Sequence, residues 1–348
     1  MYSFMNDYSE GAHPKVLELL IKSNLEQNTG YGEDIHTIKA KESIKKLLLK
    51  ENADIHFIPG GTQTNLLVIS SFLRPFEAVI AADTGHINVH ETGAIEATGH
   101  KVITVPNKDG KVTPKDILEA VRFHSDEHMV KPAMVYISDS TELGTVYKKE
   151  ELYKIRQVCN REGLLLFLDG ARLGSALTSE ENDLELSDIA ELTDVFYIGG
   201  TKNGALLGEA LVIVKEDLKA NFRYLIKQRG ALMAKGFVAG IQFEALFSDN
   251  LFFELGEHAN EMAGRIRDTL KALEVEFFAP PVSNQLFPIL PEEFLEELKD
   301  EFLFSVQKKM ENGRSAIRFV TSWATTPESV EALCGFLKKR LKREKQIL

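Results

Sequence analysis

The sequence predicts an α/β fold in which helices cover a mostly parallel sheet and a smaller α+β domain follows toward the C-terminus. Six short runs rich in β-branched and other apolar residues alternate with helical stretches, at residues 55–58, 78–81, 101–105, 133–138, 164–168 and 194–198. Such alternation is typical of a parallel sheet with helices on both faces. A chain of 348 residues is also longer than a domain with a single hydrophobic core usually is, so two domains are expected.

The pattern changes after a further strand-like run at residues 209–214, where longer helical stretches begin. We therefore divide the chain into an N-terminal segment, a large domain and a small domain, at residues 1–15, 16–245 and 246–348. The small domain contains three runs with the composition of strands, at residues 275–278, 285–288 and 316–320. Pro327 is expected to open the last helix, because the first helical turn leaves its N–H groups unpaired and proline has none.

Charge and cysteine content narrow the class of protein. Asp and Glu number 52 against 41 Lys and Arg, and the net charge of −11 has the wrong sign for binding a nucleic-acid backbone. Two cysteines are too few for a disulfide framework, and no Cys/His cluster has zinc spacing. No stretch approaches the roughly 18 apolar residues of a membrane span. We expect a cytoplasmic protein that uses no metal and binds neither nucleic acid nor a membrane.

Two polar side chains follow neighbouring strands of the predicted sheet. The run at residues 164–168 is apolar throughout, as a strand buried on both faces should be, and it ends in Asp169. Lys202 follows the run at residues 194–198 and has glycines on both sides, which let the backbone pass close to a planar ligand. Ligands of parallel sheets gather at the carboxyl ends of the strands. Both side chains are therefore predicted to lie in one ligand site.

A glycine turn between a strand and a helix adds a third element. Gly60, Gly61 and Thr62 follow the run at residues 55–58 and precede an apolar helix. Backbone N–H groups and the helix dipole make such a turn an anion site. No Walker lysine follows the turn and no Gly-x-Gly-x-x-Gly is present, so nucleotide binding is not favoured.

A phosphate cradle, a carboxylate and a lysine at strand ends match what pyridoxal 5'-phosphate requires of a protein. The lysine forms a Schiff base with the cofactor, and the carboxylate keeps the ring nitrogen protonated so that the ring accepts electrons from Cα of a substrate. His86 follows another strand end and is placed to stack on the ring. The predicted cofactor is therefore pyridoxal 5'-phosphate (PLP).

Together these residues resemble the threonine aldolase and aromatic amino acid β-eliminating lyase family. The resemblance covers nearly the whole chain and rests on Lys202 with its glycines, His86, and residues 31–34, 60–65 and 169–172. It implies a fold-type-I PLP enzyme with seven mostly parallel strands in the large domain and a small C-terminal domain. It also implies a small amino acid substrate and a homodimer or homotetramer with shared active sites.

The resemblance assigns a role to each site residue. Lys202 matches the Schiff-base lysine, Asp169 the partner of the pyridine nitrogen, and His86 the stacking residue. The phosphate turn is matched by Gly60, Gly61 and Thr62, and its cations are expected, often from the partner subunit, among Lys227, Arg229 and Lys235. The substrate carboxylate is assigned to the planar, bidentate guanidinium groups of Arg172 and Arg318, near Asn6, which stands where the family usually has a serine. Tyr31 is also expected to bind the substrate.

The resemblance implies cleavage of L-threonine, L-allo-threonine or a similar β-hydroxy amino acid to glycine and an aldehyde. The alternatives are a β-eliminating lyase or other PLP amino acid enzyme of the same fold, and a non-catalytic PLP-binding protein. One position departs from the family pattern, because Thr141 stands where threonine aldolases carry a second histidine. The reaction needs a base for the substrate β-hydroxyl. His86 is favoured as this base, with His90 and Glu142 as alternatives.

Overall fold

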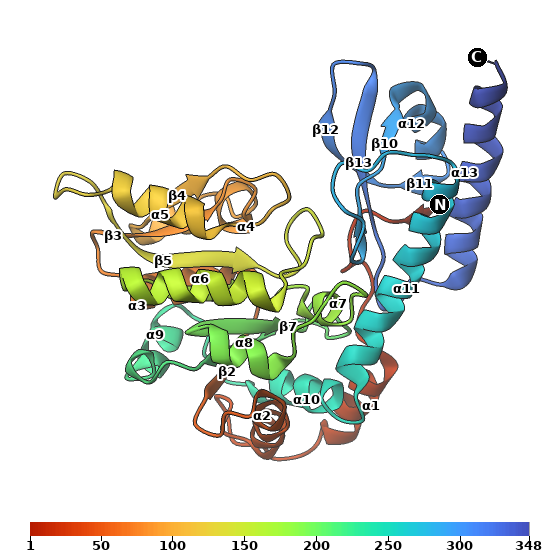
Figure 1. Ribbon diagram of the computed structural model, residues 1–348. Coiled ribbons are helices and arrows are strands. Elements are labelled where there is room, and N and C mark those ends of the chain that lie inside the picture. The colour runs from red at the N-terminus through yellow and green to blue at the C-terminus, as the bar shows by residue number, and fades with distance from the viewer. Residues whose placement is uncertain (348) are drawn as a thin grey trace.

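A seven-stranded sheet forms the centre of the molecule (Figure 1). The computed structural model describes residues 1–347, with side chains up to residue 341. The strands lie in the order β2-β8-β7-β6-β5-β3-β4, and β8 alone runs in the direction opposite to the other six. The strands are β2 (Asp54–Ile58), β3 (Glu77–Ala82), β4 (Lys101–Val105), β5 (Lys131–Ser138), β6 (Leu165–Asp169), β7 (Val195–Gly199) and β8 (Glu209–Ile213). The mostly parallel sheet predicted from the sequence is confirmed.

Helices cover both faces of the sheet because its central strands are apolar on both sides. One face packs against α2 (Ile35–Leu48), α5 (Pro114–Phe123), α6 (Lys149–Glu162), α8 (Leu186–Leu192) and α10 (Phe237–Leu246). The opposite face packs against α3 (Gly61–Phe72), α4 (His86–Val89) and α9 (Phe222–Gln228). Phe167 of β6 belongs to the second core, and strand side chains alternate between faces. Asp169, two residues later, therefore points to the α3 side.

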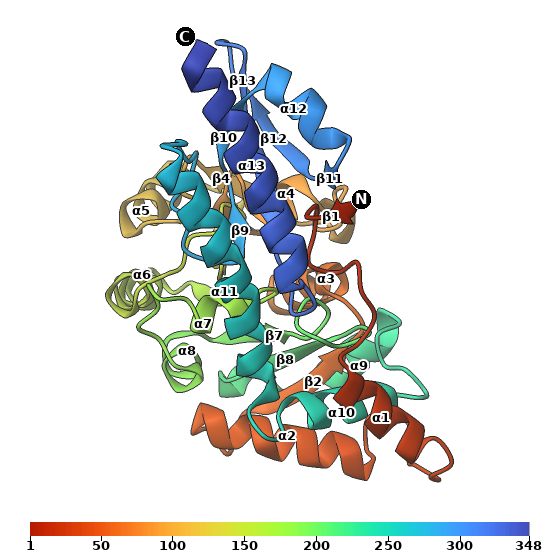
Figure 2. The same ribbon diagram turned by 90° about the vertical axis from the view of Figure 1, so that its right-hand side faces the viewer.

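The long helix α11 (Leu251–Ala272) leads from the sheet to another hydrophobic core (Figure 2). Its first turns pack with the sheet, and its residues from Met262 onward pack with α12 (Glu292–Lys299) and α13 (Pro327–Ile347). The chain enters through β1 (Tyr2–Ser3), which pairs with β11 (Phe302–Leu303), so Phe4 also lies in this core. Two further helices, α1 (Pro14–Ser23) and α7 (Leu173–Leu177), flank the large sheet. The domain boundary between residues 245 and 246 stays a prediction.

The strands of the small core gather around β13 (Arg314–Val320). It pairs antiparallel with β9 (Gln285–Leu286), β10 (Ile289–Pro291) and β12 (Ser305–Lys309). Strands were predicted near 285–288 and 316–320, but the prediction at residues 275–278 is wrong, because only an isolated bridge joins Phe277 to Pro288. Hydrogen bonds from the Phe278 N–H to the Phe287 carbonyl (2.8 Å) and from the Ile289 N–H to the Glu276 carbonyl (2.9 Å) flank this bridge, and the described residues form no second bridge beside it. The sequence gives no sign of β12, because it is mostly exposed and lacks an apolar face.

Among the helices within residues 1–347, none combines the length and the apolar character that crossing a bilayer requires.

Close packing of α10 on α2 yields a test of the fold. A Cβ added at Gly240 would lie 2.3 Å from Thr37 Oγ1 and 2.7 Å from its backbone nitrogen, whereas one at Gly335 would meet nothing within 4 Å. We expect Gly240→Ala to lower the free energy of unfolding by about 1–3 kcal/mol through overpacking. Gly335→Ala should raise it by up to about 1 kcal/mol, because alanine favours helix. Urea unfolding followed by circular dichroism measures both, and equal effects would contradict the packing argument.

Candidate active site

Two adjoining cavities open at the carboxyl ends of β5, β6 and β7. The first, of about 340 Å³, is lined by Gly61, Asp169 and Lys202 among others, and we call it the sheet cavity. The second, of about 490 Å³, reaches the small core at Arg318, and we call it the outer cavity. Both are lined by the same five residues, Tyr8, His86, Glu142, Arg172 and Lys202. These five therefore mark the junction of the two cavities.

Asp169 is a buried carboxylate that its neighbours keep ionised. The hydroxyls of Tyr136 and Tyr197 donate to its two oxygens at 2.6 and 2.5 Å, Asn65 Nδ2 donates at 3.1 Å, and the Ala171 N–H donates at 3.0 Å. Burial by itself raises the pKa of Asp169, but the electrostatic attraction of His86 and the hydrogen bonds outweigh burial, so the net pKa lies below its usual value. A buried anion is thus available to a cationic group of a ligand.

Lys202 lines the same cavity, and the pKa of its ammonium group is lowered there. Burial lowers the pKa of its ammonium group, and the neighbouring Arg172 lowers it further. A lowered pKa leaves more of the free amine, which is the nucleophilic form. Glu209 lines the sheet cavity beside it and accepts hydrogen bonds from the Gly200 N–H (3.1 Å) and the Thr201 hydroxyl (2.8 Å). Burial raises the pKa of Glu209 to about 8.

The N-terminus of α3 forms the opposite wall of the sheet cavity. Gly60 is its N-cap in extended conformation and supplies no capping side chain, and Thr62 also lines the cavity. A Cβ at Gly61 would lie 3.3 Å from the Tyr197 hydroxyl, so a larger residue would crowd the wall. The bare helix terminus is suited to an anionic group such as a phosphate.

His86 is connected to Asp169 through two buried residues that the sequence analysis did not single out. Its Nδ1 lies 2.7 Å from Glu91 Oε1, which also accepts a hydrogen bond of 2.7 Å from Asn65 Nδ2. Asn65 in turn donates to Asp169. Because the Glu91 side chain is buried, the hydrogen bond fixes the orientation of the imidazole ring at the junction of the cavities.

The two predicted carboxylate-binding arginines differ in how free they are. Arg172 donates from Nε and Nη2 to Asp7 at 2.7 and 3.0 Å, so its bidentate edge is already occupied. Arg318 donates from Nη2 to the Met5 carbonyl (3.2 Å), and its buried Nε has no partner within the described residues. Arg318 is therefore the better candidate for a ligand carboxylate, while Asp7 limits Arg172 to its remaining edge.

Five other predicted residues lie apart from the two cavities of this chain. Asn6 Oδ1 turns back to accept from the Tyr8 N–H and the Ser9 hydroxyl, both at 3.0 Å. Tyr31 is 43% exposed, and Lys227 Nζ lies 4.8 Å from its ring centroid. Arg229 and Lys235 are exposed, and the Arg229 carbonyl accepts a hydrogen bond from Gln63 on α3. Their roles toward a ligand stay predictions.

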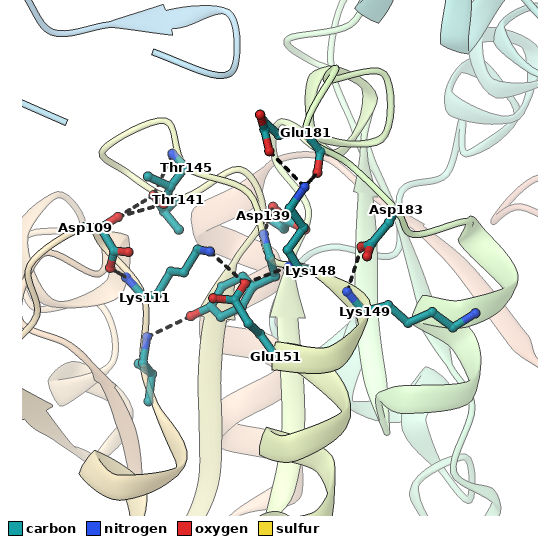
Figure 3. Close-up of polar contacts among 12 residues, drawn as sticks. Asp109, Lys111, Asp139, Thr141, Thr145, Lys148, Lys149, Glu151, Glu181 and Asp183 are labelled. Carbon is teal, nitrogen blue, oxygen red and sulfur yellow. Dashed lines mark hydrogen bonds and ion pairs between the residues drawn. The ribbon is translucent and has the colours of Figure 1, made fainter. Parts of the chain in front are cut away.

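Position 141 does not contribute to the cavities. The Thr141 side chain is fully buried, and its hydroxyl lies 2.8 Å from that of Thr145 and 3.3 Å from the Asp109 carbonyl (Figure 3). Gly110 packs so closely that a Cβ there would lie 2.6 Å from Thr141 Oγ1. The next residue, Glu142, points instead into both cavities.

These residues fit the cofactor predicted from the sequence. A buried, ionised carboxylate, a lysine with a lowered pKa and a bare helix N-terminus surround one cavity, and they match the ring nitrogen, aldehyde and phosphate of PLP. The missed partners Tyr136 and Tyr197 had one signal in the sequence, a tyrosine one or two residues before the end of an apolar strand run. Asp7 and Glu91 had none.

The buried pair of Asp7 and Arg172 gives a test with a defined pH dependence. Burial raises the pKa of Asp7, but the charge of Arg172 outweighs it, so the net pKa is lowered. Asp7→Asn should cost about 3–5 kcal/mol of stability at neutral pH, because it leaves a buried cation unpaired. The lowered pKa means that the wild-type advantage is complete above the usual aspartate value, about 4, and is lost as pH falls through the folded-state value. Urea unfolding from pH 7 to pH 3 measures it, and a constant difference would contradict this account.

Comparison with known proteins places the chain in a family. Residues 10–292 match the model of the beta-eliminating lyase family. A low specificity L-threonine aldolase of Pseudomonas sp. (strain NCIMB 10558) is 31% identical over 342 residues, covering 96% of this chain and 96% of that protein. A solved structure of a Leishmania major threonine aldolase shares 53% identity at a TM-score of 0.97, covering 98% of this chain and 100% of that one.

More distant structures share only the fold. A single mutant of Thermus thermophilus aspartate aminotransferase is 14% identical, with a TM-score of 0.73 over 97% of this chain and 91% of that one. The expected fold type I is confirmed by these neighbours. Since the family match spans most of the sequence and the cavity residues fit the cofactor, the chain belongs to the beta-eliminating lyase family.

Proposed function

We propose that the protein is a PLP-dependent lyase that cleaves L-threonine, L-allo-threonine or a similar β-hydroxy amino acid between Cα and Cβ. The products are glycine and an aldehyde. The observation that carries the proposal is the pairing, in one cavity, of an ionised Asp169 with a Lys202 whose pKa is lowered by burial. The low specificity L-threonine aldolase of Pseudomonas sp. and the Leishmania major threonine aldolase support the choice of substrate.

Each residue then has a chemical task. When bound, the cofactor supplies an electron sink for the bond that breaks at Cα. Lys202 would hold the cofactor through its amine, and the same amine would be placed to move protons near Cα of the substrate. Asp169 would hold a proton on the ring nitrogen, and His86 would pack against the ring. Arg318 orients the substrate carboxylate from the outer cavity, assisted by the remaining edge of Arg172.

The first test is substrate turnover. We expect the protein, reconstituted with PLP, to release glycine and aldehyde in equal amounts from at least one β-hydroxy amino acid, and Lys202→Ala to lose this activity at least 10²-fold. Glycine is measured by chromatography and the aldehyde by coupled reduction. Rapid pyruvate and ammonia release from an amino acid with a good β-leaving group, without threonine cleavage, would instead favour a β-eliminating lyase. Binding of PLP without any turnover would favour a non-catalytic role.

We further propose a cytoplasmic homodimer or homotetramer with shared active sites. The exposed positions of Tyr31, Arg229 and Lys235, outside the cavities of their own chain, support this. Free, buried Cys159 and Cys334 suit a reducing compartment.

Sharing of sites is tested by mixing two inactive variants. Tyr31→Ala and Lys202→Ala should each have low activity alone, the first through loss of substrate binding and the second through loss of the covalent anchor. Co-expressed, they should regain about a quarter of wild-type activity, because random pairing gives half the dimers one intact site out of two. The rate of threonine cleavage by the purified mixture measures this. No recovery would mean that Tyr31 serves its own chain or no site at all.

A further inference from the structure

Cleavage of a β-hydroxy amino acid requires a group that takes the proton of the β-hydroxyl, so the following inference rests on the proposed function. That group must lie beside Lys202 and also face the cavity that holds the substrate. Two of the five residues at the junction of the cavities are ready proton acceptors, His86 and Glu142. His90 lines the outer cavity alone.

We propose that Glu142 is the catalytic residue that takes this proton. Its Oε1 accepts two hydrogen bonds, from the His86 N–H at 2.9 Å and from the Ser138 hydroxyl at 2.7 Å. Among residues 1–341, whose side chains the structure describes, no other residue donates a hydrogen bond to Oε2. The carboxylate is therefore held through one oxygen and presents the other to a ligand, which suits a base that must keep a fixed position.

The surroundings of Glu142 and Asp169 shift the pKa values of these two carboxyl groups in opposite directions. Burial raises the pKa of Glu142, and the like charge of Asp169 raises it further. The pKa of Asp169 lies below its usual value. Carboxylates whose environments push their pKa values apart are a recurring way to obtain one permanent anion and one proton carrier. Asp169 then remains the counter-charge of the cofactor ring, and Glu142 is the stronger base.

The other candidate groups nearby each make contacts of their own or lie outside one of the cavities. Glu209 accepts hydrogen bonds from Gly200 and Thr201 and lines the sheet cavity without reaching the outer one. His86 holds Glu91 through Nδ1. The hydroxyl of Thr141 lies 3.3 Å from the Asp109 carbonyl (Figure 3), and Thr141 lines neither cavity. Among the residues whose side chains are described, Glu142 alone combines a carboxylate oxygen that accepts no hydrogen bond from another residue with a position in both cavities.

The step balances without a co-reactant. The β-hydroxyl proton passes to Glu142, the C–O bond becomes a carbonyl, and the Cα–Cβ bond breaks with its electron pair left on Cα. The aldehyde leaves, and the proton gained by the enzyme returns to Cα, so that glycine forms. Exchange of the Cα proton of glycine, in contrast, involves no hydroxyl and needs no such base.

The difference between these two reactions provides the test. In Glu142→Gln, the kcat for threonine cleavage should fall about 10²-fold or more, the range expected for loss of a general base, while exchange of the glycine Cα proton in deuterium oxide changes little. Aldehyde formation and proton nuclear magnetic resonance measure the two rates. Glu150→Gln, which removes an exposed carboxylate from α6, is the matched control and should leave both rates unchanged. Glu142→Asp keeps a carboxylate and should retain part of the cleavage rate.

Several outcomes would overturn the assignment. Cleavage at the wild-type rate in Glu142→Gln would exclude Glu142 as the base. Equal loss of cleavage and exchange would mean that Glu142 maintains the whole site. A selective loss of cleavage in His86→Asn, with Glu142→Gln unaffected, would transfer the role to His86. A wild-type protein that exchanges glycine but cleaves no β-hydroxy amino acid would refute the proposed function itself, and the base with it.

Discussion

A buried negative charge at the end of β6 constrains much of this structure. A carboxylate away from water is tolerated only when hydrogen-bond donors surround it, and Asp169 draws them from β5, β7 and α3 through Tyr136, Tyr197 and Asn65. These contacts require a fixed register between three strands and a fixed position of the helix. The turn after β6 must also pass close to β7, since a Cβ at Gly170 would lie 1.9 Å from the Tyr197 carbonyl oxygen.

The first residues of the chain connect the large sheet to the small core. Strand β1 pairs with β11, and the Phe4 carbonyl accepts a hydrogen bond from Val320. A few residues later, Asp7 pairs with Arg172, which follows β6 in the sequence, and accepts a hydrogen bond from Asn284. The outer cavity therefore lies where three distant parts of the sequence meet. Its two arginines owe their positions to this segment, because Arg318 also donates to the Met5 carbonyl.

The elements of the large sheet and the centre of the site were predictable because both depend on local patterns. Apolar runs of strand length marked all seven strands, and the polar residues that follow them, Asp169 and Lys202, line one cavity because parallel strands end at one edge. Gly61 and Thr62 marked the start of α3 in the same way. The small domain was less predictable. Its strands are short, β12 has no apolar face, and residues 275–278 form only a single bridge.

The sequence by itself determined the sheet, the strand-end residues and the anion-binding turn, since each follows from the order of side chains within about ten residues. Tertiary structure decided the partners. Asp7 and Arg172 are 165 positions apart, and Glu91 meets Asn65, 26 positions away, only because the α4 segment packs near α3. The direction of Thr141 toward Asp109, with Glu142 facing the cavities, was likewise set by packing of the loop around Gly110. Such contacts leave no periodic trace in the sequence, because they depend on which distant segments the hydrophobic core brings together.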